Sequence, residues 1–423
     1  MTADVASAIA LPLIFSRLNE PALPQISTRQ SLAIVAALGL TQIIGYGTLY
    51  YSFSLLAPGM AKDVRLSREA VFGTFSAALL AGGLAAPFMG SWMDRFGAAR
   101  MMVLGSTFCA VLLLACAWSP TAWFFVGAVI VTQVASGLVT YQAAFAALVA
   151  QAPQSATRNI TYLTLIAGFA SSIFWPITTA LTAHFDWREI YLIFAGLNLA
   201  VCLPVHFMLA RGRRPGVTGR VSGGGEAVPV VGAVPAAERR RAMIAVSIAF
   251  ALGGFALSSL LIHMVPMLGA LGLGAAAVTV SALFGPAQVA SRLVNMVFGG
   301  RLSPIGLAIL STTLIAIGGV VLAMTDGNLA GAVVFSLCVG LGSGIGSIAQ
   351  GSVPLYLFGS QGYGAIAGRM TAARLVASAA APAVFALAME RFGIPVSLLL
   401  NAALGALGIT GFALVGRGMG QVG

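Results

Sequence analysis

The sequence predicts an all-α membrane protein with twelve transmembrane helices arranged as two six-helix bundles. Composition gives the first observation: the chain of 423 residues is 59% hydrophobic and only 8% charged, whereas soluble domains carry about 25% charged residues. No soluble fold could cover this much apolar surface, so the solvent must be lipid. The second observation is that the apolar residues fall into twelve runs, divided by one long polar segment.

Each apolar run is long enough for a spanning helix, which needs about 20 residues. The runs are residues 31–58, 70–91, 99–118, 122–149, 160–183, 188–210, 242–268, 276–299, 304–325, 329–358, 367–389 and 394–415. We therefore expect bundles over residues 31–210 and 242–416, a linker over 211–241, and tails over 1–30 and 417–423. The apolar run in the first tail is too short to span, and no basic residue precedes it, so a cleaved signal peptide is not expected.

The linker and the arginines predict the orientation. Residues 211–241 hold three prolines, seven arginines and the run Gly223-Gly224-Gly225, a composition typical of a flexible linker. With the N-terminus inside, fifteen of the Lys and Arg residues outside the spans face the cytoplasm and five face the other side. This positive-inside bias predicts that both termini are cytoplasmic. We expect the membrane to be a bacterial-type inner (plasma) membrane. The bias also explains the net charge of +11 without nucleic acid.

One short polar stretch organises the chain, and it lies between the second and third runs. It reads Gly90-Ser91-Trp92-Met93-Asp94-Arg95-Phe96-Gly97-Ala98-Ala99-Arg100, and we expect a tight turn at the membrane face. Its spacing, Gly-x-x-x-Asp-Arg-x-Gly-x-x-Arg, resembles the loop signature between spans 2 and 3 of the major facilitator superfamily. An ordinary charged turn is the alternative. A weaker copy, Met296 to Ser303, follows the eighth run and keeps the arginine, Arg301. Such an internal repeat fits a two-bundle transporter.

This resemblance covers nearly the whole chain and implies a transporter of small solutes whose two halves rock about a central cavity. It also implies a cytoplasmic gate, formed by Gly90, Asp94, Arg95, Gly97, Arg100 and Arg301. Asp94 is expected to face the positive N-terminal end of a neighbouring helix. Gly90 and Gly97 are expected to allow close backbone approach and a tight turn.

Two arginines carry the prediction about the substrate. No Asp or Glu lies deep in a predicted span, whereas Arg292 and Arg374 do. A charge in the bilayer costs at least about 2.5 kcal/mol, so each should face a cavity or a partner. At 1.5 Å per residue, both lie roughly 6–8 Å to the cytoplasmic side of the midplane. Two cations at one depth, without a buried acid, indicate an anion site. The alternative is that they snorkel to the surface or cap helix carbonyls.

The position of Arg292 narrows the resemblance to the branch of the monocarboxylate transporters and the oxalate:formate antiporter. The monocarboxylate transporters have a functional arginine in span 8, four residues before the first position of the loop signature, and Arg292 stands four residues before Met296. The oxalate:formate antiporter has basic residues in spans 8 and 11, which Arg292 and Arg374 resemble. Gln288 replaces the aspartate that the monocarboxylate family has one turn earlier, and its span-1 lysine has no counterpart here. Both departures argue against its scheme of proton coupling.

Polar and aromatic stripes complete the predicted pocket. Gln42, Tyr46 and Tyr50 recur every four residues in span 1. Span 4 has Gln133, Ser136 and Thr140 with Tyr141 beside them, and span 10 has Ser343, Ser347 and Gln350. Spans 1, 4, 7 and 10 line the cavity in the superfamily. The predicted substrate-binding residues are Arg292, Arg374, Tyr46, Tyr50, Gln133, Tyr141 and Gln350. Helix–helix contact is the alternative role for the stripes.

The remaining residues give no sign of catalysis. The four cysteines are scattered in apolar runs, as expected of buried thiols, and have no metal-binding spacing. His263, in the seventh span, is expected to be a packing or hydrogen-bonding residue, with a proton relay as the alternative. No phosphate-cradling loop, metalloprotease pair or nucleophile elbow occurs. We therefore expect no enzyme activity, no cofactor, and transport driven by a gradient.

Together these features predict a secondary active transporter of a small organic anion, a mono- or dicarboxylate. It would work in the lipid bilayer by alternating access, as a monomer, with a proton or a counter-anion as the coupled species. The alternative is an efflux permease for an apolar or neutral toxic compound, in which the intramembrane arginines are structural. A receptor built on the same fold would be expected to carry a larger soluble extension.

Overall fold

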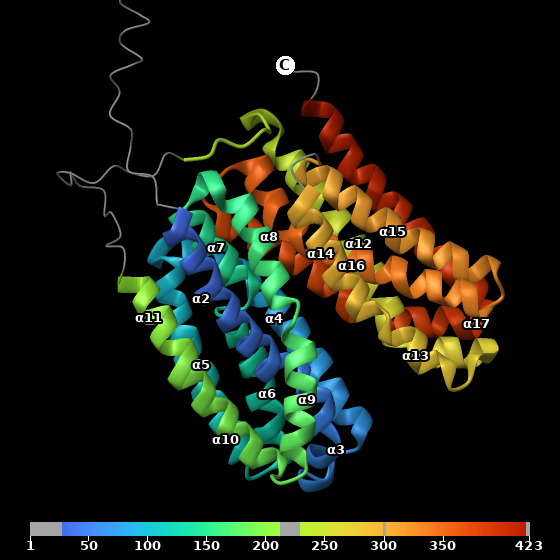
Figure 1. The fold of residues 1–423 in the computed structure, drawn as a ribbon, viewed down its shortest axis with the longest axis horizontal. Helices are drawn as coiled ribbons and strands as arrows, with labels where there is room; N and C mark the ends of the chain where they lie inside the picture. Colours follow the sequence, from blue (N-terminus) through green and yellow to red (C-terminus); the bar gives the residue numbers. More distant parts are fainter. Residues whose placement is uncertain (1–27, 212–228, 299–301, 420–423) are drawn as a thin grey trace, which may run out of the picture.

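The computed structural model describes residues 28–211, 229–298 and 302–419, and these residues are helical almost throughout. Figure 1 shows two groups of helices, one from the chain up to residue 211 (blue to green) and one from the chain after residue 229 (yellow to red). The groups meet at the top of the view and diverge below. The single β-bridge of the described residues joins Val231 to Gly359. The all-α prediction is confirmed.

The first group contains the predicted spans 1 to 6. In chain order its elements are α2 (Thr28–Tyr46), η1 (Gly47–Tyr51), α3 (Phe53–Asp63), α4 (Arg68–Phe96), α5 (Ala98–Ala117), α6 (Ala122–Ser136), α7 (Tyr141–Gln151), η2 (Pro153–Ser155), α8 (Ala156–Ala167), α9 (Ala170–Thr182), α10 (Trp187–Leu197), η3 (Asn198–Cys202) and α11 (Leu203–Arg211). The segments η1 and η3 are π-helical and lie within spans 1 and 6.

The second group contains the predicted spans 7 to 12. Its elements are η4 (Ala236–Glu238), α12 (Arg239–Leu268), η5 (Gly269–Leu273), α13 (Ala276–Ala282), α14 (Phe284–Phe298), α15 (Pro304–Met324), α16 (Leu329–Phe358) and α17 (Tyr363–Met419). The last of these is two helices joined at Gly393, whose φ of +78° and ψ of 166° are not helical. This conformation favours glycine, because a side chain there would be strained.

The helices have the length and surface of membrane spans. Eleven continuous helical stretches of the described residues are long and apolar enough to cross a membrane. Since α17 counts as two helices, the prediction of twelve spans is confirmed. Large apolar side chains face outwards along the helices, among them Trp123 (85% exposed) and Met208 (72% exposed). A surface of this kind is stable only in contact with lipid.

The two groups make their closest contact where α4 crosses α17. A Cβ at Gly90 would collide with the carbonyl oxygen of Gly364, and a Cβ at Gly364 would collide with that of Gly90. One turn further along, a Cβ at Gly368 would lie 2.5 Å from the carbonyl oxygen of Ala86. Glycine is therefore required at this crossing, because the two backbones touch. We call the end of the molecule that contains Gly90 and Gly364 the closed end.

Two connections differ in detail from what the sequence predicts. The tight turn expected between Gly90 and Arg100 is present but is a single residue long: α4 continues to Phe96, α5 starts at Ala98, and Gly97 alone lies between them, with a φ of +91°. One glycine is enough to reverse the chain, because it can adopt a left-handed conformation without strain.

The described end of the linker is also hydrogen-bonded, although the sequence predicts a flexible segment. Ala233 and Val234 donate their backbone N–H groups to the carbonyls of Tyr356 and Leu357, each at 3.0 Å. The last carbonyls of a helix have no partner within the helix, so the C-terminal end of α16 offers free acceptors to a neighbouring strand-like segment. Residues 212–228 lie outside the described residues, as do the tails 1–27 and 420–423.

Candidate functional site

A cavity of about 330 Å³ lies between the two groups of helices. It is lined by all seven of the predicted substrate-binding residues, which are Tyr46, Tyr50, Gln133, Tyr141, Arg292, Gln350 and Arg374. They come from α2, η1, α6, α7, α14, α16 and α17, so both groups contribute to one site. The residues that line the cavity include no Asp, Glu or Lys. The two arginines are thus its charged groups.

Arg292 reaches across the cavity from the second group of helices to the first. Its side chain is only 4% exposed. The Nε atom donates to the Ser347 hydroxyl at 3.2 Å, and Nη1 has no hydrogen-bond partner in the described part of the chain. The guanidinium packs against Gly168, at the junction of α8 and α9, where a Cβ would collide with Nη1. A buried cation with an unused donor favours an anionic ligand, since leaving the donor unpaired is costly.

Arg374 lies on α17 and lines the same cavity. Its aliphatic stem packs against α12, and a Cβ at Gly254 would lie 2.5 Å from its Cγ. Tyr46, Tyr50, Tyr51 and Tyr141 line the same cavity as its guanidinium. The Arg374 guanidinium makes no hydrogen bond to residues 28–211, 229–298 or 302–419. Its donors therefore remain available in the cavity.

Four tyrosines form a continuous aromatic wall opposite the arginines. The ring centroids of Tyr46 and Tyr141 are 4.8 Å apart, and those of Tyr50 and Tyr51 are 5.3 Å apart. Tyr141 also stacks on Phe145, with centroids 5.1 Å apart. The sequence analysis did not select Tyr51, because four-residue spacing puts it off the Tyr46 face. In a π-helix, residues five apart fall on one side, and η1 brings Tyr51 to the cavity.

The glutamines divide between support and lining. Gln42 is fully buried and donates to the Val139 carbonyl at 2.7 Å, so it is a helix–helix contact. Gln133 lines the cavity but donates to the Leu49 carbonyl in η1 at 2.6 Å. Gln288, whose position was noted but not selected, also lines the cavity and donates to the Ser343 hydroxyl at 2.9 Å. Gln350 lines it without a hydrogen bond to the described residues, so its amide is free.

At the closed end, Asp94 lies at the N-terminus of α17. Its two carboxylate oxygens accept hydrogen bonds from the backbone N–H groups of Gly364 and Ala365, at 2.8 and 2.7 Å. The first N–H groups of a helix have no partner within it and carry partial positive charge. The carboxylate therefore joins α4 to α17 across the two groups, in the arrangement that the sequence leads us to expect.

The other predicted gate residues have different surroundings. Arg95 is exposed, with its guanidinium carbon 5.1 Å from the centroid of the Phe96 ring. Arg100 is exposed as well, and neither arginine forms an ion pair with a carboxylate of the described chain. Gly90 and Gly97 occupy the helix crossing and the turn between α4 and α5. Arg301 lies outside the described residues.

His263 lies outside the cavity wall. It bonds to the Pro382 carbonyl through Nε2 at 2.9 Å, and its ring lies 5.6 Å from that of Phe385. This contact ties α12 to α17. Close by, Ser258 donates to the Ser378 carbonyl at 2.9 Å, which a helix would normally bond to residue 382. Proline has no N–H, so the serine supplies the missing donor. Both contacts stabilise the second group.

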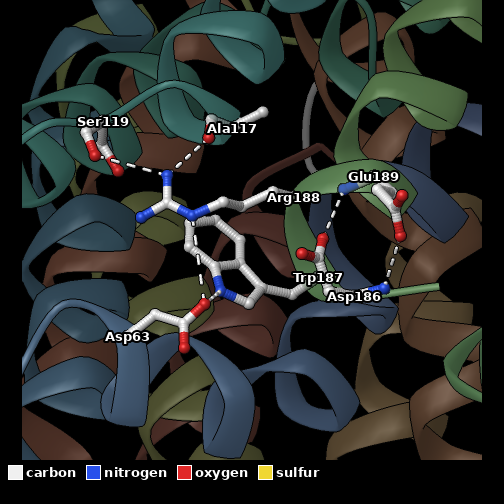
Figure 2. Close-up of polar contacts among 7 residues, drawn as sticks. All are labelled: Asp63, Ala117, Ser119, Asp186, Trp187, Arg188 and Glu189. Carbon is white, nitrogen blue, oxygen red and sulfur yellow. Dashed lines mark hydrogen bonds and ion pairs between the residues drawn. The ribbon is translucent and has the colours of Figure 1, made fainter.

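At the end opposite the closed end, a polar cluster ties the first group together (Figure 2). The Arg188 Nη1 atom donates to the Ala117 carbonyl at 2.5 Å, and its Nε lies 3.9 Å from the Asp63 carboxylate. Trp187 donates its indole N–H to the same carboxylate at 2.8 Å. Asp186 and Glu189 form a capping box at the start of α10. The cluster joins α3, α5 and α10, and among the described residues it makes no hydrogen bond or ion pair to α12–α17, so it fixes one group internally.

The comparisons with known proteins agree with this architecture. The family model described as Major Facilitator Superfamily matches residues 38–382. The fold is similar to that of the human organic anion transporter MFSD10, with 15% identity and a TM-score of 0.67 over 92% of this chain and 100% of that chain. It is similar to the E. coli transporter FucP in its outward conformation (15% identity, TM-score 0.68, 90% and 98% covered).

The proton:xylose symporter XylE also shares the fold, with 13% identity and a TM-score of 0.66 over 90% of this chain and 95% of that chain. No curated protein matches the sequence. The family model spans most of the chain, and the helices form two groups around a central cavity. This integral membrane protein therefore belongs to the Major Facilitator Superfamily of transporters.

Proposed function

We propose that the protein is a secondary active transporter of a small organic anion, a mono- or dicarboxylate. One observation carries the proposal: Arg292 and Arg374 line a single cavity whose wall holds no acidic residue. In a protein interior, a cation usually has an anionic partner, because an unpaired buried charge is costly. A substrate carboxylate would supply that partner.

The chemistry of the wall suits a carboxylate. Arginine donates two parallel N–H groups to one carboxylate, which adds both energy and orientation. Arg292 has an unused Nη1, and the hydroxyls of Tyr46, Tyr50 and Tyr141 lie around the same space. The volume of about 330 Å³ is that of a small-molecule site. That the human organic anion transporter MFSD10 shares the fold is consistent with this proposal.

We further propose that the closed end faces the cytoplasm, so that the structure represents the outward-open state. The positive-inside bias supports this orientation. In alternating access, the Asp94 contact with α17 would hold the cytoplasmic side shut and would break when the halves rock. Because the cavity wall holds no carboxylate to carry a proton, exchange with a counter-anion and entry of a proton with the substrate are the two coupling routes to compare in proteoliposomes.

Thermal-shift binding on the purified protein tests the anion site. Acetate, lactate, oxalate and succinate would be screened against the wild type, Arg292→Gln and Arg374→Gln. The matched control is Arg158→Gln, since Arg158 is exposed at the closed end and lines neither this cavity nor its neighbour of about 290 Å³. We expect at least one carboxylate to stabilise the wild type and the control but neither cavity variant. Equal stabilisation of all four proteins would refute the proposed site.

One observation favours the efflux alternative: a neighbouring cavity that shares Arg374 is lined mainly by apolar side chains. If carboxylates stabilise no form while apolar compounds stabilise the wild type and Arg292→Gln equally, the arginines are structural. The transporter would then be an efflux permease.

A further inference from the structure

A second cavity, of about 290 Å³, opens beside the first and enters the second group of helices. The two cavities share part of their walls, including Tyr50, Gln350 and Arg374. From this shared wall the second cavity extends between α12, α15, α16 and α17, away from Arg292, which lines only the first. A molecule bound at Arg374 can therefore extend into the first cavity, towards Arg292, or into the second cavity.

The inner wall of the second cavity is largely apolar. Apolar side chains line it from three helices, such as Phe250, Ile315 and Phe412. The hydroxyls of Ser311 and Thr312 are also in the wall, but they donate to the carbonyls of residues 342 and 308, at 2.7 and 2.9 Å. Arg374 is the charged residue of this wall. A polar or charged group entering the inner end would lose water and gain little in return.

We propose that the second cavity binds the hydrocarbon or aromatic part of the substrate, while Arg374 and Arg292 bind its carboxylate. The inference rests on the proposed function and narrows it. The substrate class becomes a monocarboxylate with an apolar body rather than a compact dicarboxylate. The second carboxylate of a dicarboxylate would have two places to go. It could lie in the apolar second cavity, where it would have no polar partner, or beside the first carboxylate, which would leave the second cavity empty. An apolar body would fill the second cavity, and the burial of its apolar surface would stabilise the complex.

The test is a chain-length series on the purified wild type: acetate, butyrate, hexanoate and benzoate, with succinate as the compact dicarboxylate. Burial of one methylene is expected to tighten binding about fourfold. Affinity should therefore rise steeply from acetate to hexanoate and exceed that for succinate. A flat series, or tightest binding of succinate, would overturn the inference while leaving the anion site intact. Failure of every carboxylate to bind would overturn the proposed function and this inference with it.

A variant that fills the second cavity tests whether the gain in affinity with chain length arises there. Gly253 lines the second cavity only, and a Cβ there would lie 3.7 Å from the Thr312 hydroxyl, an ordinary contact. Gly253→Leu should therefore fill part of the second cavity without disturbing α12. The matched control is Gly127→Leu, since Gly127 is exposed on α6 with no atom within 4 Å of its Cβ position.

We expect Gly253→Leu to bind acetate as the wild type does but to lose the gain from acetate to hexanoate, whereas Gly127→Leu keeps it. An unchanged gain in Gly253→Leu would overturn the inference. The wild-type series stands without any variant, so a folding defect in Gly253→Leu would not remove the test.

Discussion

Neutralising Asp94 should shift the transporter away from the state described here. In this state the carboxylate accepts two backbone N–H groups, from Gly364 and Ala365 at 2.8 and 2.7 Å, and joins the two groups of helices. Asp94→Asn keeps one acceptor oxygen but loses the other and the charge. The contact exists only while the closed end is shut, so its loss penalises that state alone.

The size of the effect follows from the two bonds. A hydrogen bond to a charged group contributes about 1.5–3 kcal/mol and a neutral one about 1 kcal/mol. Asp94 is exposed to water, which lowers the contribution of each hydrogen bond to its charged carboxylate. We therefore expect Asp94→Asn to destabilise the shut state by about 1.4–2 kcal/mol, a tenfold to thirtyfold change in the equilibrium between the two states.

Spin labels at Thr157→Cys and Gln361→Cys, exposed positions on opposite groups, would report the change by pulsed electron resonance. We expect a longer-distance population to appear in Asp94→Asn and in Ala365→Pro. The proline removes one donor from the other side, in the first turn of α17, where it is tolerated. Glu390→Gln, at an exposed site, is the control. Unchanged distances in both variants would refute the reasoning.

Three further predictions concern the cavity, the fold and coupling. Gly168→Ala should displace the Arg292 guanidinium at an overpacking cost of about 1–3 kcal/mol and weaken carboxylate binding tenfold or more by thermal shift. Gly196→Ala, with no atom near its Cβ, should not. Arg188→Gln should lower the unfolding free energy by about 1–2 kcal/mol, measured by denaturant titration. Carboxylate affinity should not change, and a loss would show that this cluster acts on the site. Vesicles preloaded with unlabelled carboxylate should take up labelled carboxylate faster than empty ones, because an empty carrier must occlude two unpaired cations; equal rates would argue against this.

Most of the residues that line the cavity could be predicted from two sequence patterns, arginines within membrane spans and polar or aromatic residues at helical spacing. Intramembrane arginines are costly, so their position inside two spans already indicates a cavity. The spacing of four residues between Tyr46 and Tyr50 predicts that both face one side of a helix, and both line the cavity. The same reasoning selects Gln42, which the structure buries between helices instead. Periodicity gives the face of a helix but does not distinguish an amide that lines a cavity from one that bonds a neighbouring backbone.

Two contacts of the cavity residues could not be predicted from the sequence, because one depends on a π-helical segment and the other on the packing of distant helices. Tyr51 reaches the cavity through the π-helical segment η1, a change in helix register. The nearest signal in the sequence is the pair Gly45 and Gly47: Gly47 begins η1, and the Phe174 ring packs where its Cβ would lie. Gly168 contacts Arg292 from another group of helices, 124 positions away in the chain. Only the folded packing brings the two together.

The partners of Asp94 belong to the main chain, and this has a genetic consequence. When two side chains form a contact, a mutation in one can be suppressed by exchanging the charge or shape of the other. The amides of Gly364 and Ala365 are the same whatever residues stand there. Revertants of Asp94→Asn should therefore map to sites that favour the shut state by other means, and not to a charge-reversed partner on α17.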